Sequence, residues 1–187
     1  SLYIAGGSTN RILRVRGETT QTTLGSSATD NYIEVFRDST QDPNLSNPRD
    51  VAVDAAGNVW VLNQGNARLT SYQPDGSTWK PAVAVATNAR GLQFDGTRLL
   101  VADYDNCRIV AFNPADGTQT AFFGTGTDHP LNVCVQGSNL LVTVLEGVGR
   151  IANYTGAPPS YSRIYATAAT SNNTDICLLY TSPSPRD

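Results

Sequence analysis

A pattern that recurs at a fixed interval constrains the fold of this chain more than any other feature. It opens at Asn47, again at Asn88 and a third time at His129, so successive copies begin 41 residues apart. Each copy contains an apolar run, a turn rich in Asp, Gly and Asn, a second apolar run, an arginine and, four residues later, an aromatic. The arginine and aromatic pairs are Arg68 and Tyr72, Arg108 and Phe112, and Arg150 and Tyr154. A period of this length, built only of short strands and turns, is typical of a β-propeller blade.

The repeat therefore predicts an all-β fold, a β-propeller of four-stranded antiparallel blades in an incomplete ring. No segment sustains the apolar spacing of a helix. The predicted blades are a partial first blade over 2–36 and full blades over 47–86, 88–123 and 129–166. The predicted strands are 2–5, 11–16, 32–36, 50–54, 59–63, 67–73, 82–86, 91–95, 99–103, 108–113, 118–123, 132–136, 139–144, 150–154 and 160–166. Residues 2–5 align with the second strand of the later blades, so we expect the first strand of that blade to precede Ser1.

The last eleven residues differ in character from the rest. Residues 177–187 read CLLYTSPSPRD and resemble, over their whole length, the in-frame translation of a sequencing adapter. We interpret 177–187 as a non-native tail and assign the propeller to 1–176. One alternative stays open: residues 175–180 could supply the first blade with its missing strand and so close a four-bladed ring.

Composition narrows the class of protein. A chain of 187 residues with 40% hydrophobic and 16% charged residues fits one globular domain. A net charge of −3 argues against a nucleic-acid-binding protein, and no apolar run is long enough for a membrane-spanning helix. Outside the tail, Cys107 and Cys134 lack the spacing of a zinc site, and we interpret both as small buried hydrophobic residues. The compartment stays open, and an extracellular or periplasmic one fits the sequence.

Three stretches identify a family resemblance. NPRDVAVD at 47–54, GNVWV at 57–61 and DYDNCRIVAF at 103–112 resemble NHL repeats, and the likeness extends over about 2–166. The resemblance implies a propeller that usually has six blades, of which this chain would hold just over half. The fourth blade departs from the pattern, because VLEGVG at 144–149 replaces the polar loop of the other copies.

Polar residues recur where ligands of propellers usually bind, at the axial mouth. There the outer strand of one blade crosses to the next blade and the two middle strands are joined. The predicted ligand-binding residues are Arg49, Gln64, Asn66, Arg90, Tyr104, Asp105, Asn106, His129 and Asn132, and Asn47 and Asn88 lie on the same face. The alternative is that Asn, Asp and Gly stand there because turns require them.

For function, the sequence favours a non-catalytic propeller scaffold that presents loops to a protein, a glycan or a small ligand. The alternative is a propeller enzyme, a metal-assisted lyase or lactonase-like hydrolase, because enzymes among the resembling proteins place metal ligands near the channel mouth. His129 is the only histidine, but it occupies the repeat slot of Asn47 and Asn88, so a turn role explains it. The segment 103–106 lacks the glycine and distal glutamate of an EF-hand loop. We predict no catalytic residue, metal ligand or cofactor in this chain, while calcium or zinc stays open for a longer parent.

Arginines also recur at one strand position. We interpret them as structural residues that span neighbouring blades and hydrogen-bond a carbonyl or carboxylate; they are Arg11, Arg68, Arg108 and Arg150. An RNA-binding face would need clustered basic residues, yet Arg49 and Arg90 stand beside Asp50 and Asp105. We therefore do not expect a nucleic-acid partner.

Overall fold

The computed structural model describes residues 1–16, 33–137, 139–146, 148–155 and 159–167. Within these ranges the regular structure is β-strand, apart from the short 3-10 helix η1 (Gly7–Thr9). The strands form four antiparallel sheets, which we call A to D in chain order. Sheet A contains β1 (Leu2–Ala5), β2 (Arg11–Val15) and β3 (Ile33–Asp38), and sheet B contains β4 (Pro48–Val53), β5 (Val59–Asn63), β6 (Arg68–Tyr72) and β7 (Thr78–Ala84). Sheet C contains β8 (Ala89–Phe94), β9 (Leu99–Asp103), β10 (Arg108–Phe112) and β11 (Gln119–Gly124), and sheet D contains β12 (His129–Gln136), β13 (Asn139–Glu146), β14 (Val148–Thr155) and β15 (Ser160–Thr167).

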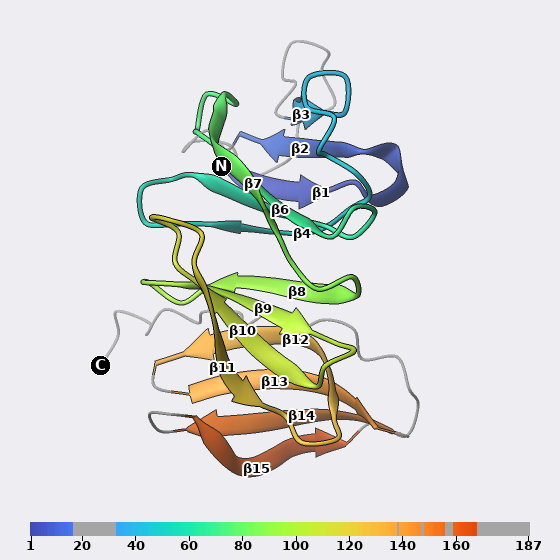
Figure 1. Cartoon of the computed structure of the whole chain (residues 1–187), viewed down its shortest axis with the longest axis vertical. Helices are drawn as coiled ribbons and strands as arrows, with labels where there is room; N and C mark the ends of the chain where they lie inside the picture. The colour runs from blue at the N-terminus through green and yellow to red at the C-terminus, as the bar shows by residue number, and fades with distance from the viewer. Residues whose placement is uncertain (17–32, 138, 147, 156–158, 168–187) are drawn as a thin grey trace, which may run out of the picture.

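The sheets follow one another along the long axis of the molecule, from sheet A at the top of Figure 1 to sheet D at the bottom. The first strands of sheets B, C and D lie side by side, since β8 contacts both β4 and β12. Strand β1 contacts β4, the first strand of the next sheet. It pairs antiparallel with β2 in the same way that β5, the second strand of sheet B, pairs with β6. The three strands of sheet A therefore correspond to the second, third and fourth strands of the other sheets.

The structure confirms the all-β prediction and corrects several strand ends. Strands β1, β5 and β9 have the predicted bounds. Strand β7 begins at Thr78 instead of residue 82, because an outer edge strand tolerates Pro81 at a bulge between Lys80 and Val83. The first strands β4, β8 and β12 begin two or three residues earlier than predicted. The possible ring closure by 175–180 and the adapter-like tail lie outside the described residues.

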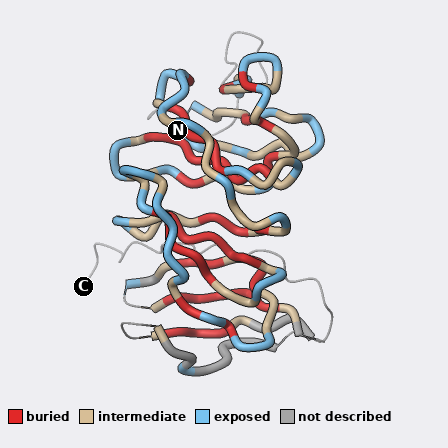
Figure 2. Tube along the Cα trace, in the orientation of Figure 1, coloured by how far each residue is buried: buried red, intermediate tan, exposed pale blue. Residues whose placement is uncertain are grey.

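Apolar side chains fill the space between neighbouring sheets, and Figure 2 shows the buried positions running through the middle of the strands. One cluster joins sheets A and B, a second joins B and C, and a third joins C and D. The recurring aromatics Tyr72, Phe112 and Tyr154 are all buried in these clusters. Each contributes about 2–3 kcal/mol by leaving water. The repeat thus produces one equivalent hydrophobic layer per pair of sheets.

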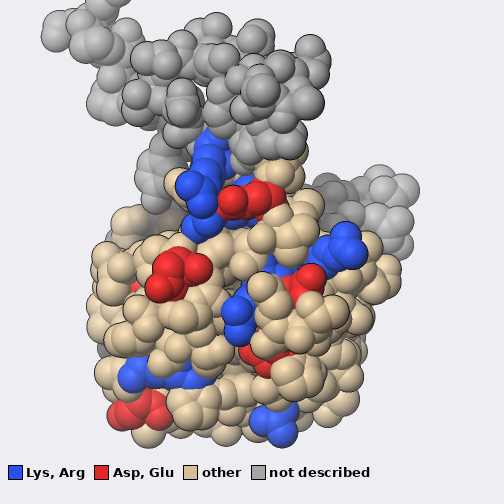
Figure 3. Space-filling model, turned by 90° about the horizontal axis from the view of Figure 1, so that it is seen from above, with Lys and Arg blue, Asp and Glu red and all other residues tan. Residues whose placement is uncertain are grey.

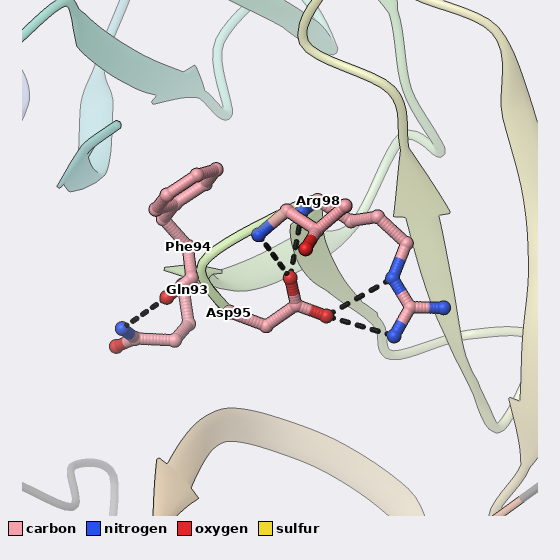
Figure 4. Close-up of polar contacts among 5 residues, drawn as sticks. Gln93, Phe94, Asp95 and Arg98 are labelled. Carbon is pink, nitrogen blue, oxygen red and sulfur yellow. Dashed lines mark hydrogen bonds and ion pairs between the residues drawn. The ribbon is translucent and has the colours of Figure 1, made fainter. Parts of the chain in front are cut away.

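Acidic residues in the turns between the first and second strands have a structural role. In the β8–β9 turn, Asp95 accepts hydrogen bonds from the backbone amides of Thr97 and Arg98, at 2.9 and 2.6 Å, and pairs with the Arg98 guanidinium (Figure 4). Asp54, one repeat earlier, accepts from the Asn58 amide and from the Trp60 indole N–H. Burial raises the pKa of Asp54, but these hydrogen bonds outweigh it and leave the pKa below its usual value. These carboxylates hold turns together.

Arg108 pairs within its own sheet and does not bridge neighbouring blades, which corrects the sequence-based interpretation for this arginine. The Arg108 Nε donates to Asp103 Oδ2 at 2.7 Å, and the two residues face each other across β9 and β10 of the same sheet. Asp103 is buried, so the bond satisfies a carboxylate inside sheet C. Arg11 and Arg68 are exposed at the start of their strands, and the Arg150 side chain lies outside the described part of the structure.

One face of sheet A is apolar and open. Leu2 and Ile33 lie in one cross-strand row, and Ile4 and Val35 lie in the next. These four residues are 64%, 52%, 42% and 48% exposed, respectively. The faces of sheets B and C, by contrast, are covered by neighbouring sheets.

Candidate ligand-binding site

A hollow of about 350 Å³ opens where the first strands of sheets B, C and D come together. We call it the axial hollow. Its lining residues are Ala5, Gly7, Asn47, Pro48, Arg49, Asp50, Gln64, Arg90, Leu131 and Asn132. They come from β1, η1, the loop before β4, β4, β8, β12 and the loop between β5 and β6. The volume suits a small molecule or a single side chain of a partner.

Three β-bulges direct side chains toward this hollow. In β4 the register steps from Pro48 opposite Asn63 to Asp50 opposite Leu62, so Arg49 has no opposite residue. A register shift at the equivalent place covers Arg90 and Gly91 in β8 and falls at Leu131 in β12. A bulge leaves an extra residue unpaired and re-aims its side chain. Arg49, Arg90 and Leu131 occupy equivalent repeat positions, and all three line the hollow.

A chain of polar contacts crosses the rim of the hollow from sheet B to sheet C. Arg49 Nη1 donates to Gln64 Oε1 at 3.2 Å, and Gln64 Nε2 donates to Asn88 Oδ1 at 3.3 Å. Asn88 Nδ2 then donates to Asp105 Oδ1 at 3.0 Å. These bonds fix the Gln64 amide, so Arg49 is held in place by a neutral partner.

Arg90 is held by an aromatic stack. Its guanidinium carbon lies 3.9 Å from the centre of the Tyr104 ring, and Tyr104 stacks on His129 with ring centres 4.6 Å apart. His129 Nδ1 lies 2.8 Å from the Tyr104 carbonyl oxygen. A carbonyl can only accept, so Nδ1 carries the hydrogen in this pair. His129 therefore supports Tyr104, which in turn supports Arg90.

The charges at the hollow are unequal. Two arginines and one aspartate line it. Burial lowers the pKa of Arg49, and the positive charge of Arg90 lowers it further, while Asp50 acts in the opposite direction. Asp50 Oδ1 accepts from the Val51 amide and Oδ2 from the Leu92 amide, each at 2.8 Å. The carboxylate is therefore bound to the backbone on both oxygens.

The structure gathers most of the predicted site residues, but not all. Arg49, Gln64, Arg90 and Asn132 line the hollow, and Tyr104, Asp105 and His129 join it through the contacts above. Asn66 and Asn106 belong to turns. Asn66 Nδ2 donates to the Asn44 carbonyl at 2.8 Å, and Asn106 Nδ2 donates to both oxygens of Asp103.

Sequence reasoning missed five lining residues, Ala5, Gly7, Pro48, Asp50 and Leu131, among them the charged Asp50 and the apolar Leu131. Asp50 and Leu131 could have been found from the repeat. Asp50 shares its slot with Gly91 and Asn132, and Leu131 shares its slot with Arg49 and Arg90. Comparing each slot across the copies, instead of selecting polar residues, would have identified them.

The cysteines separate into two kinds. Cys134 is buried, as predicted, whereas Cys107 is partly exposed in a turn with a left-handed φ of 49°. The Cys107 Sγ lies 3.5 Å from His129 Nδ1. Burial raises the pKa of the Cys107 thiol, and nearby aspartates raise it further, so the thiolate is disfavoured. No group of three or more His, Cys, Asp or Glu that could hold a metal ion occurs among the described residues.

Charge is mixed on one face of the molecule. On the face in Figure 3, basic and acidic side chains lie next to one another and no broad patch of one sign forms. Within the described ranges no helix is long and apolar enough to cross a membrane.

No protein-family model and no curated protein matches the chain. Solved structures do resemble it. A chain of the nidogen/laminin complex superposes with a TM-score of 0.68 at 14% identity, over 88% of this chain and 61% of that one. Virginiamycin B lyase from Staphylococcus aureus superposes with a TM-score of 0.63 at 17% identity, over 88% of this chain and 52% of that one. Hydrazine synthase from Kuenenia stuttgartiensis gives 0.54 at 15% identity, over 63% and 35%.

The chain therefore spans less than two thirds of the length of each of these neighbours. At these identities the likeness concerns the fold alone. The nidogen/laminin and virginiamycin B lyase neighbours are β-propeller proteins with antiparallel four-stranded sheets. Together with the four stacked sheets, they confirm the prediction from the repeat: the chain has the β-propeller fold, in an incomplete ring of blades.

Proposed function

We propose that the chain is part of a non-catalytic, NHL-type propeller, six-bladed in its parent, whose axial hollow binds a small ligand or a short segment of a protein or glycan. One observation carries this proposal. Two arginines on equivalent bulges of adjacent sheets line one hollow, each held by neighbouring side chains. Fixed polar groups around a concave surface favour recognition.

The chemistry of the lining supports binding over catalysis. Asp50 is the only carboxylate among the ten lining residues, and both its oxygens accept backbone amides. General-base catalysis requires a carboxylate or imidazole within reach of substrate and able to take a proton. His129 is occupied by Tyr104 through a hydrogen bond and a ring stack.

Two of the neighbours bear on the choice of ligand and class. The nidogen neighbour comes from a complex of two proteins, which supports a protein segment as one ligand class. The S. aureus neighbour is a lyase, which supports the alternative of a propeller enzyme acting at the same mouth. A metal-assisted mechanism in the parent would need ligands in addition to His129.

The test combines binding with ligand recovery. Isotope-labelled protein is titrated with neutral oligosaccharides, capped peptides and small organic acids, while backbone amide signals of Arg49, Arg90 and Asn132 are followed by NMR. Each ligand is then analysed by mass spectrometry after incubation with and without Zn²⁺ or Ca²⁺. We expect saturable shifts at the hollow and ligand recovered unchanged. Ligand conversion that depends on residues of the hollow would overturn the non-catalytic proposal in favour of the enzyme.

A further inference from the structure

Neither arginine of the hollow forms an ion pair with a carboxylate among the described residues. The ion pairs among the described residues use Arg14, Arg16, Arg98 and Arg108. Within the same part of the structure, Arg49 bonds to an amide oxygen and Arg90 stacks on a ring. An arginine at a concave site that is not bonded to a carboxylate of the protein is suited to binding an external anion.

Arg90 also has an unsatisfied donor. Its Nε is buried and has no hydrogen-bond partner among the described residues. Stacking on Tyr104 uses the face of the guanidinium and leaves the N–H groups at its edge for in-plane hydrogen bonds. A buried donor without an acceptor is unfavourable, so an acceptor supplied by a ligand would be stabilised there.

Charge and shape select the kind of anion. Two arginines and one aspartate leave a net single positive charge in the lining, which one negative charge would neutralise. A guanidinium presents parallel N–H groups that match the two oxygens of a carboxylate. A guanidinium also binds phosphate, but phosphate carries up to two negative charges, more than the net charge of the lining would neutralise.

We infer that the axial hollow is a carboxylate site in which Arg49 and Arg90 bind the acid group of a small organic acid or of an acidic peptide segment. This inference rests on the proposed binding function. Leu131, in the third equivalent slot, adds an apolar side chain to the same lining. The ligand is therefore expected to carry an apolar portion next to its carboxylate.

The experiment compares matched probes on the full chain. Glutarate is compared with its neutral diamide, and a capped peptide containing Glu is compared with the same peptide containing Gln. Glutarate and the Glu peptide are each also compared with inorganic phosphate. Binding is followed through the Nε–H signal of Arg90 by NMR at two salt concentrations. Variants Arg49→Gln and Arg90→Gln test the site, and Arg68→Gln removes an exposed arginine that does not line the hollow.

We expect the acids to bind at least about tenfold more tightly than their neutral analogues, and each site variant to weaken the acids by a similar factor. Arg68→Gln should leave binding unchanged. Preference for glutarate or for the Glu peptide then distinguishes the two sources of the carboxylate. Unchanged backbone NMR signals away from the hollow establish that the variants are folded. The Arg90→Gln variant has no Arg90 Nε–H signal, so binding to it is followed through the backbone amide signal of Leu131.

Three results would overturn the inference: equal binding of acid and neutral analogue, tighter binding of phosphate than of either acid, or equal weakening by Arg68→Gln. If neutral analogues bind at the hollow independently of both arginines, the proposed binding function remains valid and only the inference of a carboxylate ligand is refuted. Conversion of the probe to product would instead remove the non-catalytic function.

Discussion

Sheets B, C and D meet along their first strands, and we call each such contact a seam. The seam between sheets B and C and the seam between sheets C and D are held by different interactions. At one repeat slot, Asp50 of β4 reaches across to β8 and accepts the Leu92 amide at 2.8 Å. The next copy has Gly91 in that slot, and a Cβ built there would lie 2.5 Å from Asn132 Oδ1 and 2.7 Å from its Cα. The first seam is joined by a side-chain hydrogen bond, and the second by close approach of two backbones.

The comparison of the two seams shows which positions of the repeat stay apolar and which vary. Both seams keep the apolar layer behind them, one around Trp60 and Phe112 and the other around Ile109 and Val142. At the inner edge, by contrast, the slot changes from Asp to Gly to Asn along the copies. The apolar layer determines the fold, whereas the inner edge is free to vary and to shape a ligand site.

The largest expected effect comes from the layer between sheets B and C. Leu62→Ala removes a fully buried side chain and should cost about 2–5 kcal/mol of unfolding free energy. Urea unfolding followed by tryptophan fluorescence measures it. Leu2→Ala is the control, because Leu2 is exposed and its truncation should cost less than about 0.5 kcal/mol. Equal losses in the two variants would mean that this layer does not hold the sheets together.

The polar joint of the first seam should come next. Asp50→Ala leaves the Leu92 amide without its acceptor and should cost about 1–3 kcal/mol. Hydrogen exchange at the Leu92 amide gives a local readout, and it should accelerate. Asp50→Asn keeps a side-chain oxygen and should lose less. If exchange at Leu92 stays as slow in Asp50→Ala as in the parent chain, the bond does not join the sheets.

The steric joint of the second seam is tested by adding a methyl group. Gly91→Ala should cost about 1–3 kcal/mol, because the new Cβ meets backbone atoms of Leu131 and Asn132. Thermal unfolding compares it with Gly124→Ala, where the nearest atom is the Cys107 carbonyl oxygen at 4.0 Å. We expect Gly124→Ala to be close to neutral. Similar melting temperatures for both variants would refute the close approach.

The smallest effect concerns a hairpin that sheets A, B and C share. Asn10, Ala67 and Cys107 each precede the recurring arginine, with φ of 50°, 54° and 49°. A left-handed residue costs about 1–2 kcal/mol, and glycine avoids this at an entropic cost of about 0.5–1 kcal/mol. Ala67→Gly should therefore stabilise by about 0.5 kcal/mol. Ala84→Gly, within β7, should destabilise slightly, and a loss of stability in both variants would argue against strain at Ala67.

The sequence predicted the strands of this molecule better than its site. Val59–Asn63 could be placed because an apolar run stands between two clear turns. The start of β7 could not, because Pro81 looks like a breaker until the strand is known to lie at an edge. The axial hollow depends on bulges, and a bulge is one extra residue relative to a partner strand that the local sequence does not reveal. The sequence therefore indicates Arg49 and Arg90 only as polar residues near the mouth, and it does not reveal that both lie at bulges of first strands.

The open face of sheet A has a consequence for how the molecule behaves in solution. The chain has an exposed apolar face formed by Leu2, Ile4, Ile33 and Val35. When two identical faces meet across a two-fold axis, they form a closed dimer and not a growing filament. Raising the protein concentration should therefore populate dimers first, which sedimentation velocity would resolve. Dilution should then return the dimers to single copies of the chain.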